Sequence, residues 1–245
     1  MGLGFTHTGY RNLLSRLLAA GYRPAAFADA ERLLTEDVRF VLLRHDIDFA
    51  LAPALAMARI EAEMGIASAW FVLVRTEHYN LFSAESSRIV EEILGMGHRL
   101  GLHFDCAAYP GATVPELNTA CVKEAGLLED WFGVDVPVVS FHRPAQFLIG
   151  SDDGLTAPRL HTYMPLFSGP IHYLADSRGL WRYGEPLDSP AFLAGKPLHL
   201  LVHPIWWREA ETTPAQTLSD FIVRRSREIE SSVAANSTVY QTGKR

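Results

Sequence analysis

Polar residues that can bind metals or transfer protons interrupt apolar segments of the chain at four places. The four segments are Arg44-His45-Asp46-Ile47-Asp48, Gly101-Leu102-His103-Phe104-Asp105, Ser140-Phe141-His142-Arg143-Pro144 and Leu201-Val202-His203-Pro204. Six side chains in them are of the types that a metal site with acid and base catalysis requires, namely Asp46, Asp48, His103, Asp105, His142 and His203. Each segment lies at the carboxyl end of a predicted strand, where parallel α/β folds place their chemistry. The four segments together predict one catalytic rim.

Asp46 and Asp48 are two residues apart, so in an extended strand both side chains leave the same face. Two carboxylates held this close repel each other unless a cation or a shared proton lies between them. A divalent metal meets that condition, with one carboxylate as its ligand and the other as the acceptor of a proton from water. The alternative is a pair of solvated loop aspartates, with Asp48 as the N-cap of a helix that begins near Ala50.

The histidines divide into two groups. His103 follows an apolar strand and is predicted to point into the rim, and His203 can protonate a leaving group because its pKa lies near working pH. His98 lies on the opposite strand face and is interpreted as structural or exposed. His199 is interpreted as a buried histidine whose hydrogen bonds are satisfied.

The segments that must position these side chains alternate between strands and helices. Strands are predicted over 39–43, 69–74, 99–104, 136–141 and 198–202, and helices over 10–20, 50–64, 83–95, 115–132 and 213–231. The prolines, glycines and aromatic residues of 143–196 predict long loops around short strands. This alternation predicts parallel strands with helices outside, in an open sheet or a (β/α) barrel. No repeat, low-complexity tract or linker is found, so residues 1–245 are predicted to form a single catalytic domain.

Composition excludes several classes of protein. With 48% hydrophobic and 20% charged residues in 245, the chain can bury a core, and its formal charge of −6 argues against nucleic acid as a partner. Two cysteines, Cys106 and Cys121, are too few for a disulfide framework and form no CxxC motif. The sequence has no signal-peptide pattern and no apolar run of eighteen residues, so we expect a cytoplasmic protein without a membrane span.

The order of these motifs resembles the polysaccharide deacetylases of carbohydrate esterase family 4, the NodB-homology group. The resemblance extends over about residues 38–208 and depends on Asp46-Ile47-Asp48, Gly97-His98-Arg99-Leu100-Gly101-Leu102-His103, His142-Arg143-Pro144 and Leu201-Val202-His203-Pro204. It implies a distorted (β/α) barrel of about seven parallel strands with helices outside. It also implies that the chain removes acetyl groups from amino sugars with the help of a divalent metal.

The resemblance assigns roles to six residues. In chain order these are the catalytic base Asp46, the metal ligand Asp48, the metal ligand His103, the arginine Arg143 that braces the base, Asp176 near the acid, and the acid His203.

One position departs from the family pattern. The family has its second metal histidine four residues after the first, and this chain has Ala107 there. His142 is predicted as the substitute third ligand because it lies at a strand end on the same rim, and Asp105 is the second candidate, with substrate binding as its other possible role. Neighbours in a strand face opposite ways, so His142 and Arg143 both point inward only if the chain bends, which Pro144 allows.

The predicted reaction is hydrolysis of the acetyl amide of an N-acetylated sugar or glycan precursor, with zinc or a similar borderline divalent metal as cofactor. Asp46 would be positioned by Arg143 or Arg44, and His203 by Asp176. Trp181 and Trp206 lie in or beside rim segments and are predicted to stack on sugar rings, with core packing as the alternative. Two other functions stay open, a hydrolase of small amides or cyclic ureides on the same fold and a non-catalytic sugar-binding protein.

Overall fold

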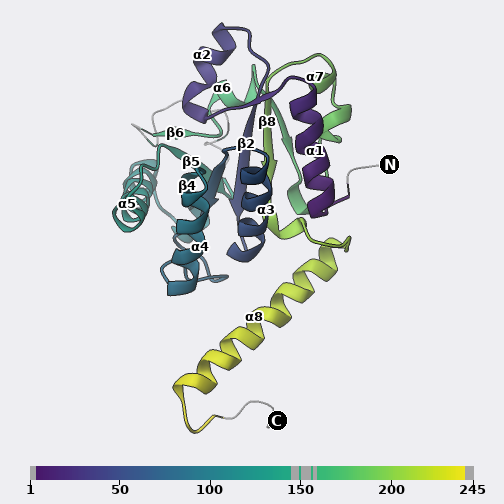
Figure 1. Ribbon diagram of the computed structural model, residues 1–245. Coiled ribbons are helices and arrows are strands. Elements are labelled where there is room, and N and C mark those ends of the chain that lie inside the picture. The colour runs from purple at the N-terminus through teal and green to yellow at the C-terminus, as the bar shows by residue number, and fades with distance from the viewer. Residues whose placement is uncertain (1–3, 145–148, 150–155, 157–158, 241–245) are drawn as a thin grey trace.

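The computed structural model describes residues 4–144, 149, 156 and 159–240. Its seven main strands are all parallel to their neighbours and follow the spatial order β6-β5-β4-β3-β2-β8-β7. Their bounds are β2 Phe40–Ile47, β3 Ala69–Val72, β4 Arg99–Asp105, β5 Val138–His142, β6 Leu160–His161, β7 His172–Ala175 and β8 Leu198–Val202. The sheet curls into a half-barrel with helices around it (Figure 1), which confirms the predicted distorted (β/α) barrel.

Eight α-helices accompany the strands in the described residues. They are α1 His7–Ala19, α2 Ala30–Thr35, α3 Leu51–Glu63, α4 Ala84–Gly95, α5 Val114–Phe132, α6 Pro165–Ser168, α7 Pro190–Leu193 and α8 Pro214–Asn236. The helices α2 and α7, which lead into β2 and β8, lie at the top of Figure 1, and α8 lies at the bottom. The carboxyl ends of β2 and β8 therefore point toward the side of the molecule where α8 lies.

The predicted helices and strands recur with small shifts at their ends. Ser83 caps α4 by accepting a hydrogen bond from the Ser86 amide, and α5 begins with a capping box of Thr113 and Glu116. The sequence prediction missed three short helices, α2, α6 and α7, and a two-residue strand, β1 (Arg23–Pro24), which pairs with the start of β2. Such short elements form because the rest of the fold holds them in place, and they carry little periodicity of their own.

The strand β2 is longer than predicted, because it continues through the polar residues after Leu43. All of its residues are buried, and they alternate between two sides of the sheet. Val41 and Leu43 pack with the outer helices, whereas Phe40 and Leu42 pack in a second core inside the curl of the sheet. The same alternation continues at the polar end of the strand.

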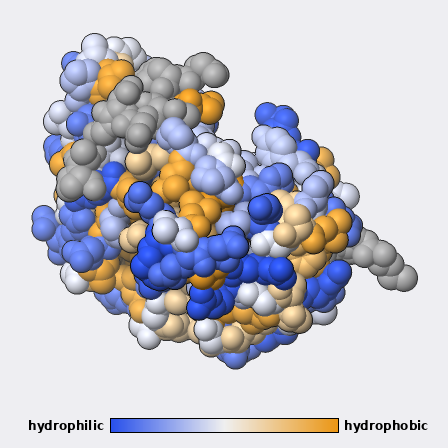
Figure 2. Space-filling view, turned by 90° about the horizontal axis from the view of Figure 1, so that it is seen from above, coloured by the Kyte–Doolittle hydropathy of each residue, from blue (hydrophilic) through white to orange (hydrophobic). Residues whose placement is uncertain are grey.

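Figure 2 shows the end of the molecule where α2 and α7 lie, seen from above. Hydrophilic and hydrophobic residues are interspersed over this face. Among the described residues, no helix is long and apolar enough to cross a membrane.

Candidate metal centre and catalytic groups

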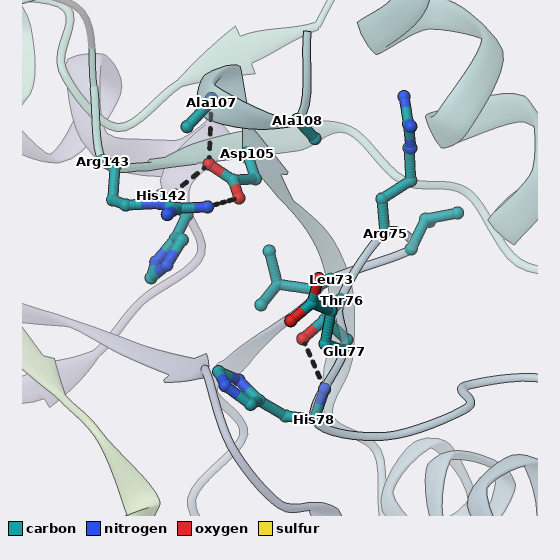
Figure 3. A pocket seen from close by; sticks show the side chains of 11 residues that line it. Leu73, Arg75, Thr76, Glu77, His78, Asp105, Ala107, Ala108, His142 and Arg143 are labelled. Atoms are coloured by element: carbon teal, nitrogen blue, oxygen red, sulfur yellow. Dashed lines mark hydrogen bonds and ion pairs between the residues drawn. The ribbon is translucent and has the colours of Figure 1, made fainter. Parts of the chain in front are cut away.

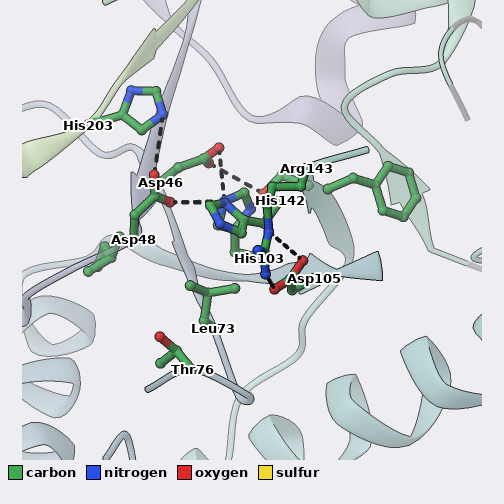
Figure 4. A network of polar contacts seen from close by, with 12 residues as sticks. Asp46, Asp48, Leu73, Thr76, His103, Asp105, His142, Arg143 and His203 are labelled. Carbon is green, nitrogen blue, oxygen red and sulfur yellow. Dashed lines mark hydrogen bonds and ion pairs between the residues drawn. The ribbon is translucent and has the colours of Figure 1, made fainter. Parts of the chain in front are cut away.

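Three predicted metal ligands come together at the carboxyl end of the sheet. Asp48 follows β2, His103 lies in β4 and His142 ends β5, and one ligand atom from each lies within 4.8 Å of the other two (Figure 4). Asp48 Oδ1 is 3.1 Å from His103 Nε2 and 3.5 Å from His142 Nδ1. The alternative role of Asp48 as a helix cap is wrong, because Ala50 is the N-cap of α3 and no side chain caps that helix.

The polar atoms of this cluster fit a divalent cation. Asp48 Oδ1 is buried and makes no hydrogen bond within the described residues, which is costly unless a ligand satisfies it. Ser140 Oγ lies 2.7 Å from His103 Nδ1, so the opposite ring nitrogen, Nε2, is the one that faces Asp48. One carboxylate oxygen and two imidazole nitrogens are a donor set that suits zinc and similar borderline ions.

Asp46 lies beside this cluster in a buried ion pair with Arg44. The Arg44 guanidinium donates from Nε to Asp46 Oδ1 at 2.9 Å and from Nη2 to Oδ2 at 2.7 Å, and Asp46 Oδ2 is 3.6 Å from His103 Nε2. Burial by itself raises the pKa of Asp46, but Arg44 and His103 together hold that pKa well below its usual range. Asp46 is therefore ionised at neutral pH.

The prediction that Arg143 braces Asp46 is wrong, and Arg44 makes that contact. Arg143 has a left-handed backbone with φ of 49°, which turns the chain directly after β5. Its side chain is 61% exposed and pairs with Asp105 (Figures 3 and 4). The bend after β5 therefore lies at Arg143 itself, one residue before Pro144.

Asp105 is not part of the metal-ligand cluster. Its carboxylate accepts hydrogen bonds from the Arg143 guanidinium and, at 3.1 Å, from the Ala107 amide. The described ligand cluster holds His142 and not Asp105, so the structure favours His142 over Asp105 as the third ligand. Ala107 contributes only a methyl group at the position where the family has a histidine.

His203 and Asp176 form a second pair at the rim. His203 Nδ1 lies 2.6 Å from Asp176 Oδ1, and the His203 amide donates to both carboxylate oxygens at 3.0 Å. Trp207 Nε1 donates to Asp176 Oδ2 at 2.8 Å. Burial alone lowers the pKa of His203, but Asp176, with Asp48 and Asp46 further away, raises it to about 9. His203 Nε2 faces the cluster, 3.9 Å from Asp48 Oδ2.

A polar pocket of about 590 Å³ opens beside His142 (Figure 3). Its walls are the segment 73–78 after β3, the residues that follow β4, and the end of β5, and they include Arg75, Glu77, His78, Asp105, His142 and Arg143. Pockets of this volume hold small molecules or one or two sugar units.

Trp181 and Trp206 do not line this pocket. Trp206 is buried in the hydrophobic core, and Trp181 stacks on Phe5 with 5.7 Å between ring centroids and meets the edge of Trp207. Their positions favour core packing, which was the alternative to a sugar platform.

The other two histidines lie away from the rim. His98 is buried, where its Nδ1 accepts a hydrogen bond from the Ser68 amide and its Nε2 lies 3.0 Å from the Ala58 carbonyl, so its structural interpretation is confirmed. His199 is buried as predicted, but only its Nδ1 has a partner, the Phe167 carbonyl at 3.2 Å.

Sequence reasoning gave Arg44 second place, did not identify Ser140, and did not predict the contact of Trp207 with Asp176. A signal existed for the first two. Arg44 has the strand parity of Asp46, and Ser140 has the parity of His142 and lies directly across from His103 in the β4–β5 register. Trp207 has no comparable signal, because its contact with Asp176 depends on the path of the chain after β8.

No protein-family model matches the chain, and no curated protein is significantly similar to it. Several solved structures are similar to it. One is the chitin deacetylase from Colletotrichum lindemuthianum, with 15% identity and a TM-score of 0.47 over 76% of this chain and 82% of that one. Another is IcaB from Ammonifex degensii, with 19% identity and a TM-score of 0.43 over 55% of this chain and 65% of that one. A family 4 carbohydrate esterase pseudoenzyme from Bacillus anthracis is also similar (12%, 0.44, 78% and 61%). The chain thus spans less than two thirds of the last two proteins, and with TM-scores below 0.5 these similarities carry no weight for its chemistry.

Proposed function

We propose that this chain is a metal-dependent hydrolase that removes the acetyl group from an N-acetylated sugar or glycan precursor. The observation that carries the proposal is the meeting of three kinds of group at one rim. Asp48, His103 and His142 offer a ligand set, Asp46 offers a carboxylate base, and a histidine–aspartate pair offers an acid.

Asp48, His103 and His142 would hold the cation, which supplies a Lewis acid that polarises the acetyl carbonyl and a water molecule. Asp46 accepts the proton of the attacking water. Arg44 fixes the orientation of Asp46 with two hydrogen bonds and keeps it ionised, at some cost to its strength as a base.

His203 donates a proton to the departing nitrogen. A pKa of about 9 keeps its imidazole protonated at neutral pH, as an acid requires, and Asp176 fixes the ring by contacting Nδ1. The products are acetate and a free amine.

The sugar substrate is proposed from the resemblance of the motifs, and the polar pocket beside His142 supports a polar substrate. Zinc is proposed from the donor set of one oxygen and two nitrogens. Asp105 and Arg143 line that pocket and are proposed to contact the substrate.

The first experiment measures metal content by mass spectrometry on protein purified without chelator, together with deacetylase activity on acetylated amino sugars. We expect about one zinc per chain, lost in His142→Ala and kept in His172→Ala, which removes an exposed histidine outside the site. Zinc retained by His142→Ala would move the third ligand elsewhere. Zinc without deacetylase activity would favour small amides or cyclic ureides as substrates, and no metal after reconstitution would favour a binding protein.

A further inference from the structure

The C-terminal helix α8 projects from the body of the protein (Figure 1). Its first turns are attached, since Thr217 is buried and the Phe221 ring lies 5.6 Å from that of Phe49. No residue of α8 after Thr217 is buried in the described structure. At about 1.5 Å per residue, the part of the helix beyond Phe221 extends over roughly 20 Å.

This free part carries an apolar stripe. Ile222, Ile229 and Val233 are separated by seven and four residues, which puts them on one helix face, and they are 63%, 51% and 44% exposed. Leu218 continues the stripe toward the body, where it is partly buried. A helix in water gains most of its stability from packing an apolar face, so this stripe predicts a partner.

We propose that the α8 stripe (Leu218, Ile222, Ile229 and Val233) packs against the same stripe of a second copy of this chain, with the two helices antiparallel. The spacing of the stripe is four, seven and four residues, which reads the same in both directions. A twofold axis beside Arg225 and Ser226 therefore places Ile222 against Ile229 of the second copy and Leu218 against Val233. A twofold interface requires a surface that is complementary to itself in this way.

The charges of α8 support the same partner and orientation. The helix has three arginines and three carboxylates, so it lacks the net positive charge with which amphipathic helices bind anionic membranes. In the antiparallel pair the residue opposite Arg225 is Ser226 of the second copy. Glu228 of that copy is about two residues further along the helix, so it lies near Arg225. A parallel pair would instead bring Arg225 next to its own copy, because it lies between Ile222 and Ile229 at the seam, and like charges there repel.

The first test is the mass of the full chain in solution by light scattering over a range of concentrations. We expect a species of twice the 27.2 kDa chain mass. Ile222→Glu combined with Ile229→Glu should raise the dissociation constant at least about a hundredfold. Ser231→Glu adds a charge on the opposite, exposed face of α8 and should leave the dimer intact. A monomer at every concentration, or a dimer indifferent to the double substitution, would overturn the proposal.

A second test reports the orientation of the helices. Chains with Ile222→Cys and chains with Ile229→Cys are mixed, oxidised and mapped by peptide mass spectrometry. The antiparallel pair predicts disulfides between position 222 of one chain and position 229 of the other, whereas links between like positions would refute it. A wild-type monomer that binds vesicles of phosphatidylcholine and phosphatidylserine through α8 would also refute it, in favour of a membrane surface.

Discussion

Two polar clusters lie on opposite faces of β2, and only one of them has the features of a site. Asp46 points to the rim beside His103 and His142. Its neighbour His45 points the other way, toward α1 and α3, where its Nε2 lies 2.7 Å from Glu61 Oε1. Tyr10, Ser68 and His98 complete this second group, which we call the helix-side cluster (Tyr10, His45, Glu61, Ser68 and His98).

The two clusters differ in charge and in access to a pocket. In the helix-side cluster Tyr10 and Ser68 both donate to Glu61, and burial raises the pKa of Glu61 to about 8 despite these hydrogen bonds. His45 Nδ1 in this cluster is buried and has no hydrogen-bond partner among the described residues. Glu61 is then protonated at neutral pH. On the rim, Arg44 keeps Asp46 ionised, and Asp48 Oδ1 has no hydrogen-bond partner in the described chain. Histidines, carboxylates and an unpaired buried atom therefore do not by themselves make a site, whereas an unpaired carboxylate oxygen next to a ligand-sized pocket points to a ligand.

The largest expected effect comes from removing the negative charge of Asp46 at the rim. Asp46→Asn should lower kcat by about 10²–10⁴-fold because it removes the proposed base. It should also lower the free energy of unfolding by about 3–5 kcal/mol, because Arg44 is left as an unpaired buried charge. Steady-state kinetics are measured at a temperature where circular dichroism shows folded protein, with metal content as the control. Full activity in the folded variant would mean that another group accepts the proton.

The acid pair gives a smaller effect. Asp176→Asn should lower the pKa of His203 and reduce kcat by about 10- to 100-fold, because the ring loses its charged partner. Trp207→Phe is the matched control, since it removes one hydrogen bond to Asp176 and leaves the charge. Equal losses in the two variants would show that packing around Asp176, and not its charge, limits the reaction.

Each cluster contains one buried serine, and substituting these serines tests the two clusters separately. Ser140→Ala removes the partner of His103 Nδ1 and should weaken zinc binding by about 10- to 100-fold. Ser68→Ala removes a donor to Glu61 and should cost about 1–3 kcal/mol of unfolding free energy with no change in zinc affinity. Zinc titration and urea unfolding of both variants check this, and a loss of zinc affinity in Ser68→Ala would contradict the separation.

The last prediction concerns the pH dependence of stability. The native pKa of Glu61 is about 8 and its ordinary value is 4.5, so between these limits the unfolded chain releases a proton that the native chain retains. Wild-type stability should therefore fall as pH rises through this window, by up to about 1.4 kcal/mol per pH unit. Glu61→Gln removes this loss, so its stability relative to wild type should increase from pH 4.5 to 8. Urea unfolding measures the free energy of unfolding of both proteins against pH. If the wild-type and Glu61→Gln profiles ran parallel, Glu61 would be ionised in the native state.

The sequence by itself determined the alternation of strands and helices and the faces of the strands. The two-residue spacing of Asp46 and Asp48, and the position of His103 at a strand end, follow from the period of a strand and the direction of parallel pairing. These local rules were sufficient to predict parallel strands with helices outside, in an open sheet or a barrel, and to name residues that meet at the rim. The distorted barrel was implied by the family resemblance.

Only the tertiary structure decided which side chains pair. The left-handed backbone at Arg143 directs that arginine to Asp105 and leaves Arg44 to hold Asp46. The contacts of Glu61 with His45 and of Trp207 with Asp176 join residues 16 and 31 positions apart. Such pairings depend on backbone turns and on the packing of helices against the sheet, which strand periodicity does not specify.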